Sequence, residues 1–381
     1  MFAVSILAEK CNEFNIPMWA ATLDFKRAFD SISHASIWES MLAHRVPPVY
    51  VDLLSRLYQD QRATIQCDCK SREFYIRKGT KQGDPISPII FNCVLDEVLR
   101  TVKRKWSLKK FGMQLGHTDL RTMTNLRFAD DILLIGRTLP QIKQMIADIA
   151  VEGAKVGLEL HPDKTKILHN NIGYGSRCTK AHIQGMDIEI LSPSSSTMYL
   201  GRALSLTNTH DTELEHRVRR AWAKFGTMKQ ELTDKNVPIG LRLKLFHATV
   251  TPTILYGAGS WVMTDAREAT LRTTQLKMLR AMLGKKRLMT DGGETETWVD
   301  WVKRVTADAR QLMELHKITD WNVEVRDRIC KWATRVKNMD NDRWAKVALG
   351  WQPDGLRSRG RPRIRWTDQL EEWGRGCHAH P

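Results

Sequence analysis

Residues 126–135 read LRFADDILLI and place two adjacent carboxylates, Asp130 and Asp131, between apolar runs that are typical of strands. Because side chains alternate between the two faces of a strand, a regular strand cannot direct both acids to one point, whereas a tight turn at residues 129–131 can. Two carboxylates that are held close repel each other, so one takes up a proton unless a cation neutralises them. A plain surface turn, in which Asp is common, is the competing interpretation.

A second apolar stretch upstream also ends in an acid. Residues 3–14 are predicted to form a short helix and residues 18–23 (MWAATL) a buried strand, which Asp24 follows directly. Ser33 is suited to cap the next helix. An acid at the carboxyl end of a central strand is where α/β folds usually keep their chemistry, although Asp also serves as an ordinary turn residue.

Composition favours a polyanionic partner. The 381 residues include 59 Lys and Arg against 43 Asp and Glu, a formal charge of +16, which favours nucleic acid over a membrane. Seven cysteines without a C-x-x-C pair indicate neither a disulfide framework nor a zinc ribbon. The apolar start of the chain is broken by Glu9 and Lys10, so neither a membrane span nor a signal peptide is expected. We therefore expect an intracellular protein of the cytoplasm or nucleus with no membrane partner.

A basic loop over residues 78–88 (KGTKQGDPISP) precedes a long helix that Pro88 is suited to begin. Backbone N–H groups in such a loop, together with Lys78 and Lys81, can receive phosphate or lie along a nucleotide. The Gly-Lys-Ser/Thr ending of a Walker loop is absent. The loop therefore indicates a nucleotide site of another kind.

The order of elements predicts an α+β fold, a split β-α-β sheet with helices on one face. In such a sheet the strand ends at Asp24 and Asp130 can be neighbours despite their separation in sequence. Two further helices are expected, one from Pro47-Pro48 and one from Pro140 to Gly157. Two hairpins are expected, one of residues 64–67 and 73–76 with Cys67 and Cys69 as strand residues, and a small one around Ile183 and Ile188. Strands are also expected over residues 158–160 and 166–168.

Three carboxylates on one sheet, with no Cys or His beside them, select a hard cation that prefers oxygen ligands. Mg²⁺ fits, and Mn²⁺ is the alternative, because such ions take one or two carboxylates together with substrate phosphates. Two such ions about 3.5–4 Å apart clamp the attacking and leaving oxygens of a phosphoryl displacement. The acids, the basic loop and the positive chain together predict nucleotidyl transfer onto a primer 3′-hydroxyl.

Five short motifs resemble those of reverse transcriptases of non-LTR (LINE-type) retrotransposons, in the same order and over roughly residues 1–205. They are residues 22–31 (TLDFKRAFDS, motif A), 81–88 (KQGDPISP, motif B), 128–131 (FADD, motif C), 157–166 (GLELHPDKTK, motif D) and 199–202 (YLGR, motif E, the primer grip). The resemblance implies a right-hand polymerase palm and an RNA-directed DNA polymerase, with an RNA template, a DNA primer and deoxynucleoside triphosphates as partners.

The resemblance also implies roles for particular residues. Phe29 matches the position that stacks under the incoming sugar and excludes a 2′-hydroxyl. Lys164 matches a lysine that protonates the leaving pyrophosphate, although Lys166 lies on the same strand face. The implied catalytic acids and metal ligands are Asp24, Asp130 and Asp131, together with the carbonyl of Phe25. The implied nucleotide site includes Lys81, Gln82 and Gly83. The implied primer grip includes Tyr199, Leu200 and Gly201.

The chain departs from the family in one respect. It starts immediately before motif A, so we expect a truncated frame, a palm with incomplete fingers and no endonuclease domain. Two alternatives stay open: a catalytically silent remnant that only binds RNA or DNA, and a protein like a group II intron maturase.

Residues 206–285 are predicted to form a helical thumb. From Thr212 an apolar helix face opposes a basic one, and the resemblance places Arg217 and Arg220 on primer and template. Ordinary solvation is the competing interpretation of the basic face. The predicted apolar face consists of Leu214, Val218, Ala221, Trp222 and Phe225, and the basic face of His216, Arg217, Arg219, Arg220 and Lys224.

Residues 286–381 form a basic, mostly helical region rich in Trp and Arg. Recurring Trp residues here are more often core than a base-stacking platform. Alternating Arg361, Arg363 and Arg365 are suited, in extended form, to successive phosphates. The terminal Cys377, His378 and His380 are a weak indication of metal.

Overall fold

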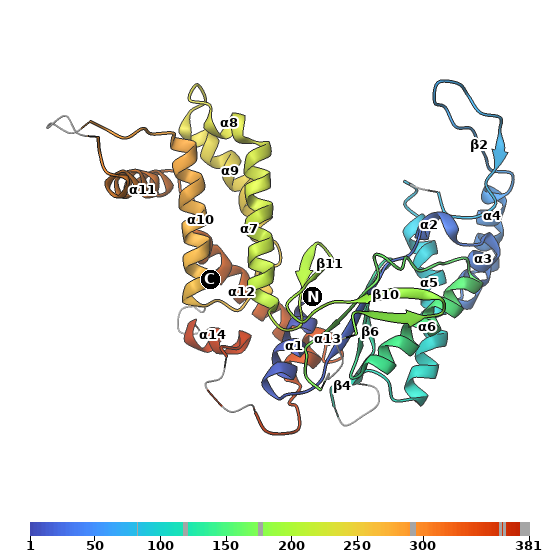
Figure 1. Ribbon diagram of the computed structural model, residues 1–381. Helices are drawn as coiled ribbons and strands as arrows, with labels where there is room; N and C mark the ends of the chain where they lie inside the picture. Colours follow the sequence, from blue (N-terminus) through green and yellow to red (C-terminus); the bar gives the residue numbers. More distant parts are fainter. Residues whose placement is uncertain are drawn as a thin grey trace.

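A six-stranded sheet lies at the centre of the palm (Figure 1). The computed structural model describes residues 1–81, 83–116, 121–173, 178–289, 295–357, 360 and 363–373. The strand order is β6-β7-β1-β8-β10-β9. In chain order the strands are β1 (Trp19–Leu23), β6 (Asn125–Phe128), β7 (Asp131–Gly136), β8 (Lys166–His169), β9 (Lys180–Ile183) and β10 (Met186–Ile190).

The register of the central strands brings the acidic strand ends together. β1 pairs antiparallel with β7 on one side and with β8 on the other, and Leu23 lies opposite Ile132. Asp24 follows Leu23, and Asp131 precedes Ile132. The two acids therefore lie at the same end of neighbouring strands.

Two strand predictions need correction, and a third is confirmed. Residues 158–160 form no strand, because only Leu160 makes an isolated bridge, to Phe25. The predicted hairpin at 64–67 and 73–76 pairs over two residues on each side, in β2 (Arg62–Ala63) and β3 (Phe74–Tyr75), and Cys67 and Cys69 lie in a bend, not in strands. The hairpin around Ile183 and Ile188 is confirmed, but it also extends the main sheet, because β10 runs parallel to β8.

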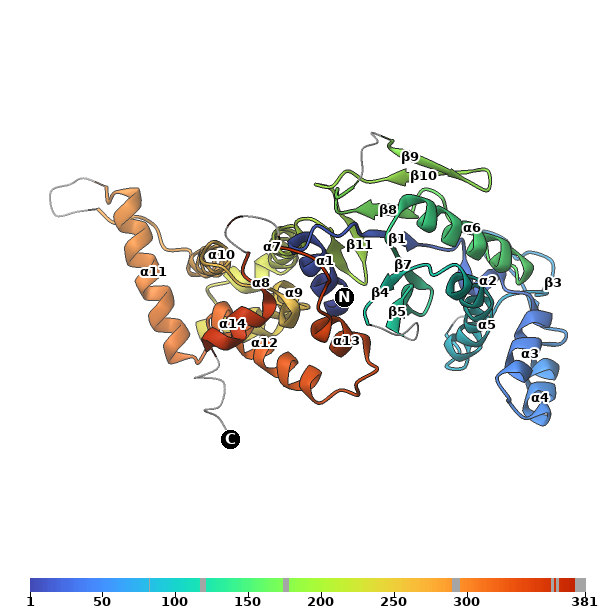
Figure 2. The same cartoon turned by 90° about the horizontal axis from the view of Figure 1, so that it is seen from below.

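Two long helices cover one face of the sheet (Figure 2). α5 (Ser87–Leu108) and α6 (Leu139–Lys155) share a buried cluster with Leu134 and Ile167. On the other face, Leu133 belongs to a second cluster that includes α1 (Phe2–Glu13) and the thumb. The smaller elements at the palm edge are α2 (Ala28–Ser31), α3 (His34–Ala43), α4 (Pro48–Tyr58), β4 (Met113–Gln114) and β5 (Thr122–Met123).

Local sequence signals set several helix starts as expected. The Ser33 hydroxyl accepts the Ser36 N–H at 3.1 Å at the start of α3. Prolines stand in the first turns of α4 and α5, where a missing N–H costs nothing. Among the described helices, none combines the length and apolarity that a membrane crossing requires.

The helical thumb follows a short hairpin of β11 (Thr197–Tyr199) and β12 (Arg202–Leu204). Its helices stand beside the palm (Figure 1) and pack around buried side chains that include Phe225, Phe246 and Met278. They are α7 (Thr209–Thr227), α8 (Lys229–Thr233), α9 (Ile239–Ile254), the short helix η2 (Ala258–Ser260) and α10 (Asp265–Leu283).

The C-terminal helices return to the start of the chain. The Glu9 carboxylate accepts the Trp366 N–H at 3.0 Å, and Lys10 Nζ donates to the Leu349 carbonyl at 2.6 Å. Trp321 and Trp366 are fully buried, as expected of core residues. These helices are α11 (Trp298–Leu315), α12 (Trp321–Lys337), α13 (Trp344–Gly350) and α14 (Trp366–Trp373).

Candidate active site

The predicted tight turn between β6 and β7 is present. Phe128 pairs with Asp131, which leaves Ala129 and Asp130 as the two-residue turn. Ala129 has φ 52°, a left-handed conformation that costs a residue with a side chain about 1 kcal/mol. The turn places Asp130 and Asp131, both half-exposed, at the tip of the hairpin.

Asp24 is held at the end of β1 by the segment that precedes β8. The Asp24 carbonyl accepts the His161 N–H at 2.8 Å, and the Glu159 carbonyl accepts the Lys26 N–H at 2.8 Å. Because these bonds flank the Phe25–Leu160 bridge, the N–H and C=O of Phe25 itself point away from this segment, toward the β7 side. The Phe25 carbonyl therefore faces the side of β1 on which β7 and Asp131 lie.

Asp131 is influenced by its burial and by the other two acids. Burial raises the pKa of Asp131 above its usual value, and the charges of Asp130 and Asp24 raise it further. The Asp24 Oδ2 atom is buried without a hydrogen bond, and Lys164 Nζ lies 3.4 Å from it as an ion pair. Lys164 is therefore a cation beside Asp24.

The donor set fits a hard divalent ion. It consists of carboxylate and carbonyl oxygens, which suit such ions when water and substrate phosphates complete the shell. The Asp24 Oδ2 atom accepts no hydrogen bond, and its one ion-pair contact within the described residues, to Lys164, is 3.4 Å long, so it can still accept a cation. In the part of the chain that the structure describes, no three His, Cys, Asp or Glu side chains are close enough to hold an ion alone. Such a site would have to be completed by the substrate.

The predicted nucleotide side of the site packs against the turn after β1. The Phe29 ring stacks on Phe91 of α5 with centroids 4.5 Å apart, and the Phe29 carbonyl accepts the Thr80 N–H at 2.7 Å. A Cβ on Gly79 would lie 2.8 Å from the Asp30 backbone, so only glycine allows this approach. The basic loop is thereby fixed beside Phe29.

The other residues predicted for this side are less constrained. Lys81 and Gly83 are exposed, and Gly83 has φ +84°. The Lys81 carbonyl accepts the Ser87 hydroxyl at 2.6 Å, which ties the loop to the start of α5. Gln82 lies outside the described residues.

The primer-grip prediction needs correction at Tyr199. Its side chain is buried, and its hydroxyl donates to the carbonyls of Leu126 (3.4 Å) and Asp131 (3.5 Å). Burial, with the charge of Asp131, raises the pKa of Tyr199. Tyr199 therefore supports the acidic hairpin from behind and offers no surface to a primer. Leu200 and Gly201 do form the turn, with φ 51° and 69°.

Arg217 also departs from its predicted exposed position. Its Nε donates to Glu213 at 2.7 Å, its guanidinium donates to the Gly201 carbonyl, and its side chain is buried. Arg202 Nε reaches the same Glu213 oxygen at 3.2 Å. We call Arg202, Glu213 and Arg217 the thumb-root cluster.

The thumb-root cluster was not anticipated from the sequence, although Glu213 and Arg217 have the i,i+4 spacing of a helical ion pair. Glu213 also accepts the Ala203 N–H at 2.6 Å, and the Tyr256 hydroxyl reaches the Leu200 carbonyl at 3.2 Å. The cluster thus joins the primer-grip turn to the thumb. Arg220, by contrast, is exposed as predicted.

The C-terminal arginines are only partly available. Arg365 donates to the Glu13 carboxylate, which raises the pKa of Arg365, so this side chain is engaged within the protein. Arg363 is exposed, and its guanidinium reaches the Thr207 carbonyl at 3.4 Å. Arg361, Cys377, His378 and His380 lie outside the described residues.

Comparison with known proteins agrees with this arrangement. The family model described as "Reverse transcriptase (RNA-dependent DNA polymerase)" matches residues 7–204. A transposon-derived protein of Caenorhabditis elegans is 30% identical over 264 residues, 66% of this chain and 85% of that protein. The Pol polyprotein of a type-2 retrotransposable element from Drosophila melanogaster is 32% identical over 190 residues, 48% of this chain but 17% of the polyprotein.

A solved structure, apo telomerase from Candida tropicalis, matches at 12% identity and a TM-score of 0.40, over 91% of this chain and 50% of that one. A similarity this weak carries no argument by itself. The family match covers half of the chain, so the chain belongs to the reverse transcriptases, specifically those of non-LTR retrotransposons. This family of RNA-directed DNA polymerases uses divalent metal ions.

Proposed function

We propose that this chain catalyses RNA-directed DNA synthesis, in which a primer 3′-oxygen attacks the α-phosphorus of a deoxynucleoside triphosphate. The new P–O bond replaces the bond to the β-phosphate, pyrophosphate leaves, and the primer hydroxyl loses its proton. The observation that carries the proposal is the strand register, which sets Asp24 and Asp131 at the same end of β1 and β7 with Asp130 in the adjoining turn. Two bound Mg²⁺ ions would supply the charge neutralisation and hydroxyl activation that this displacement needs.

The protein's own groups divide the remaining work. Asp24, Asp130 and Asp131, with the Phe25 carbonyl, would hold the ions. Lys164, whose Nζ lies 3.4 Å from the Asp24 carboxylate, would give a proton to the leaving pyrophosphate. The Phe29 ring, fixed against Phe91, would exclude a ribose 2′-hydroxyl.

Primer extension on an RNA template tests the proposal. With Mg²⁺ and deoxynucleotides we expect incorporation by the intact chain and a loss of at least about 10³-fold in Asp130→Asn, because transition-state charge is no longer stabilised. Asp163→Asn, an exposed acid in the loop before β8, is the matched control and should keep full activity.

Two results would contradict the proposal. If the intact chain binds RNA but incorporates nothing, the silent-remnant alternative holds. If Asp130→Asn incorporates as well as the intact chain, the acids are not the site. Phe29→Val gives a further check, since a smaller side chain should admit ribonucleotides.

A further inference from the structure

A cavity of about 360 Å³ lies at the end of α5, outside the candidate active site. Its wall comes from the last turns of α5 and the segment after it, from β5 and the start of β6, and from the start of α13. Figures 1 and 2 both show α13 beside the β4–β5 hairpin. Asn125 in this wall begins β6, whose other end leads into the acidic turn, so the cavity and the acids lie at opposite ends of one strand. The side chains of the wall used below are Lys103, Lys110, Phe111, Thr124, Asn125 and Trp344.

Two lysines of this wall have no acid that neutralises them. Within the described residues, neither Lys103 nor Lys110 forms an ion pair or a side-chain hydrogen bond, and both side chains are exposed. Burial of its ammonium lowers the pKa of Lys103, and the charge of Arg127 lowers it further, against the opposing charge of Asp96. Asp96 is itself already paired with Arg127 and Arg100. Two uncompensated cations therefore border one cavity.

The rest of the wall combines aromatic and hydrogen-bonding groups. The Trp344 indole packs against the buried cluster shared by α1 and the thumb, and it also borders the cavity. The Phe111 ring is a second, partly exposed aromatic side. The Asn125 amide oxygen accepts the Thr124 hydroxyl at 3.2 Å, while the amide nitrogen makes no hydrogen bond within the described residues. The wall thus offers positive charge, aromatic surface and a hydrogen-bond donor together.

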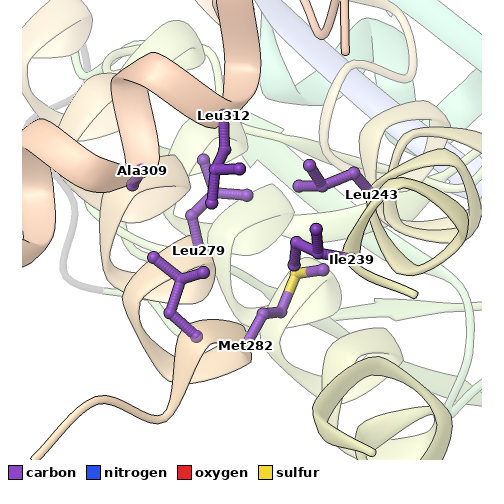
Figure 3. A pocket seen from close by; sticks show the side chains of 7 residues that line it. Ile239, Leu243, Leu279, Met282, Ala309 and Leu312 are labelled. Atoms are coloured by element: carbon purple, nitrogen blue, oxygen red, sulfur yellow. The ribbon is translucent and has the colours of Figure 1, made fainter. Parts of the chain in front are cut away.

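A cavity in the thumb has the opposite character (Figure 3). Its volume is about 10 Å³, and the described residues that line it, among them Ile239, Met282 and Leu312, are all apolar. A space of this size holds at most one water, and an apolar wall gives that water no partner. The cavity at the end of α5 differs in both size and chemistry, as a ligand site does.

We propose that the cavity at the end of α5 binds a nucleotide unit, with its phosphate at Lys103 and Lys110 and its base against the aromatic wall. Lysine ammonium groups bind phosphate as point charges, and aromatic surface with nearby hydrogen-bonding groups suits a base. The volume lies within the range of about 300–1,000 Å³ that small-molecule sites have. An acidic peptide would use the lysines but leave the aromatic wall without a role. The unit is either a free nucleotide or an unpaired residue of a strand.

The test measures binding by the full chain in the absence of divalent ions. Calorimetric titration would give Kd values for adenosine 5′-monophosphate, adenosine and ribose 5-phosphate, and fluorescence anisotropy the Kd of a labelled 12-nucleotide RNA. We expect the loss of either phosphate or base from the mononucleotide to weaken binding about tenfold. Attraction to the dipole of α5 is the competing explanation of the lysines, and it predicts no ligand.

A charge-matched variant separates local contact from general attraction. The double variant Lys103→Ala with Lys110→Ala should weaken binding of the mononucleotide or of the RNA at least about tenfold, and the ligand with the larger change identifies the source of the unit. Arg104→Ala removes an exposed cation next to Lys103 in the chain but outside the cavity wall, and it should change both Kd values less than about twofold. Circular dichroism verifies that the variants are folded.

Three results would overturn the proposal. They are Kd values in the double variant within about twofold of the intact chain for both ligands, an equal loss in Arg104→Ala, and binding of ribose 5-phosphate as tight as that of the mononucleotide. Because the assays contain neither divalent ion nor primer, their outcome is independent of the proposed polymerase activity. Primer extension by the double variant reports on that activity separately.

Discussion

Two groups of charged side chains lie on either side of the primer-grip turn, and they are built in opposite ways. In the thumb-root cluster one carboxylate, Glu213, is fully buried between two arginines. At the palm edge, Asp24, Asp130 and Asp131 lie at neighbouring strand ends, and the exposed Lys164 pairs with Asp24. The buried carboxylate of the first group is fully compensated by arginines, whereas in the second group three carboxylates have Lys164 beside only one of them. A compensated buried carboxylate serves position and stability, whereas uncompensated carboxylates create a place for an external cation.

The hydrogen bonds support the same contrast. Burying an ion costs several kcal/mol, which is offset only when its lone pairs are used. Both Glu213 oxygens accept bonds, from Arg202, Arg217 and the Ala203 N–H. The Asp24 Oδ2 atom, although also buried, accepts none. The Asp24 carboxylate therefore has an oxygen that accepts no hydrogen bond, whereas both carboxylate oxygens of Glu213 already accept hydrogen bonds.

The largest effect on stability is expected from breaking the thumb-root cluster. Glu213→Gln should lower the free energy of unfolding by about 3–5 kcal/mol, because two buried arginines lose their counter-charge. Urea unfolding measures this, with Glu215→Gln on the exposed side of α7 as the control, expected within about 0.5 kcal/mol. A loss at Glu213 no larger than at Glu215 would show that the cluster is not a stabilising element.

A smaller effect is expected at Tyr199, which links the two regions. Tyr199→Phe removes two long hydrogen bonds to the acidic hairpin, so we expect a loss of about 0.5 kcal/mol in stability. Primer extension should fall several-fold, since the hairpin loses a fixed support, while Tyr75→Phe at an exposed position should change neither. An unchanged rate of primer extension in Tyr199→Phe would show that Tyr199 does not position the acids.

The smallest effect concerns pH. The folded chain holds a proton on Asp131 to higher pH than the unfolded chain does, because its pKa is raised. The free energy of unfolding should therefore fall as pH rises from the ordinary Asp pKa of 3.8 through the raised value. Glu9, whose pKa burial raises to about 7, has the same sign, so the comparison must be with Asp131→Asn. The free energies of unfolding of the intact chain and of Asp131→Asn are compared from pH 3 to pH 7. A constant difference between them would contradict the raised pKa of Asp131.

Local chemistry explains which parts of this structure the sequence could predict. The Asp130-Asp131 turn, the Ser33 cap and the helix begun near Pro88 depend on neighbouring residues alone, and all three are present. The parallel pairing of β10 with β8 depends on a contact between separate segments, for which no periodicity gives a signal. Residues 158–160 alternate like a strand, but among them only Leu160 is a bridge residue, so no strand forms.

The candidate active site shows the same contrast between features set by neighbouring residues and features set by contacts between distant segments. The sequence predicts the acids because they lie at strand ends, whereas the basic face that it predicts for α7 includes Arg217, which the structure buries. Residue spacing predicts a basic helix face only if each arginine prefers water. Here Glu213, one turn earlier, pairs with Arg217 and makes burial of the Arg217 side chain favourable. The partner Arg202 comes from another element, so its contribution is visible only in three dimensions.

Binding of Mn²⁺, followed by its paramagnetic resonance signal, tests the central claim most directly. With a primer–template that lacks a 3′-hydroxyl and a matching deoxynucleotide, the intact chain should bind two ions close enough to broaden each other's signal. Asp24→Asn and Asp130→Asn should each abolish that broadened signal, while Asp163→Asn should retain it. Equal Mn²⁺ binding by all four chains would contradict the convergence of the three acids on one metal site.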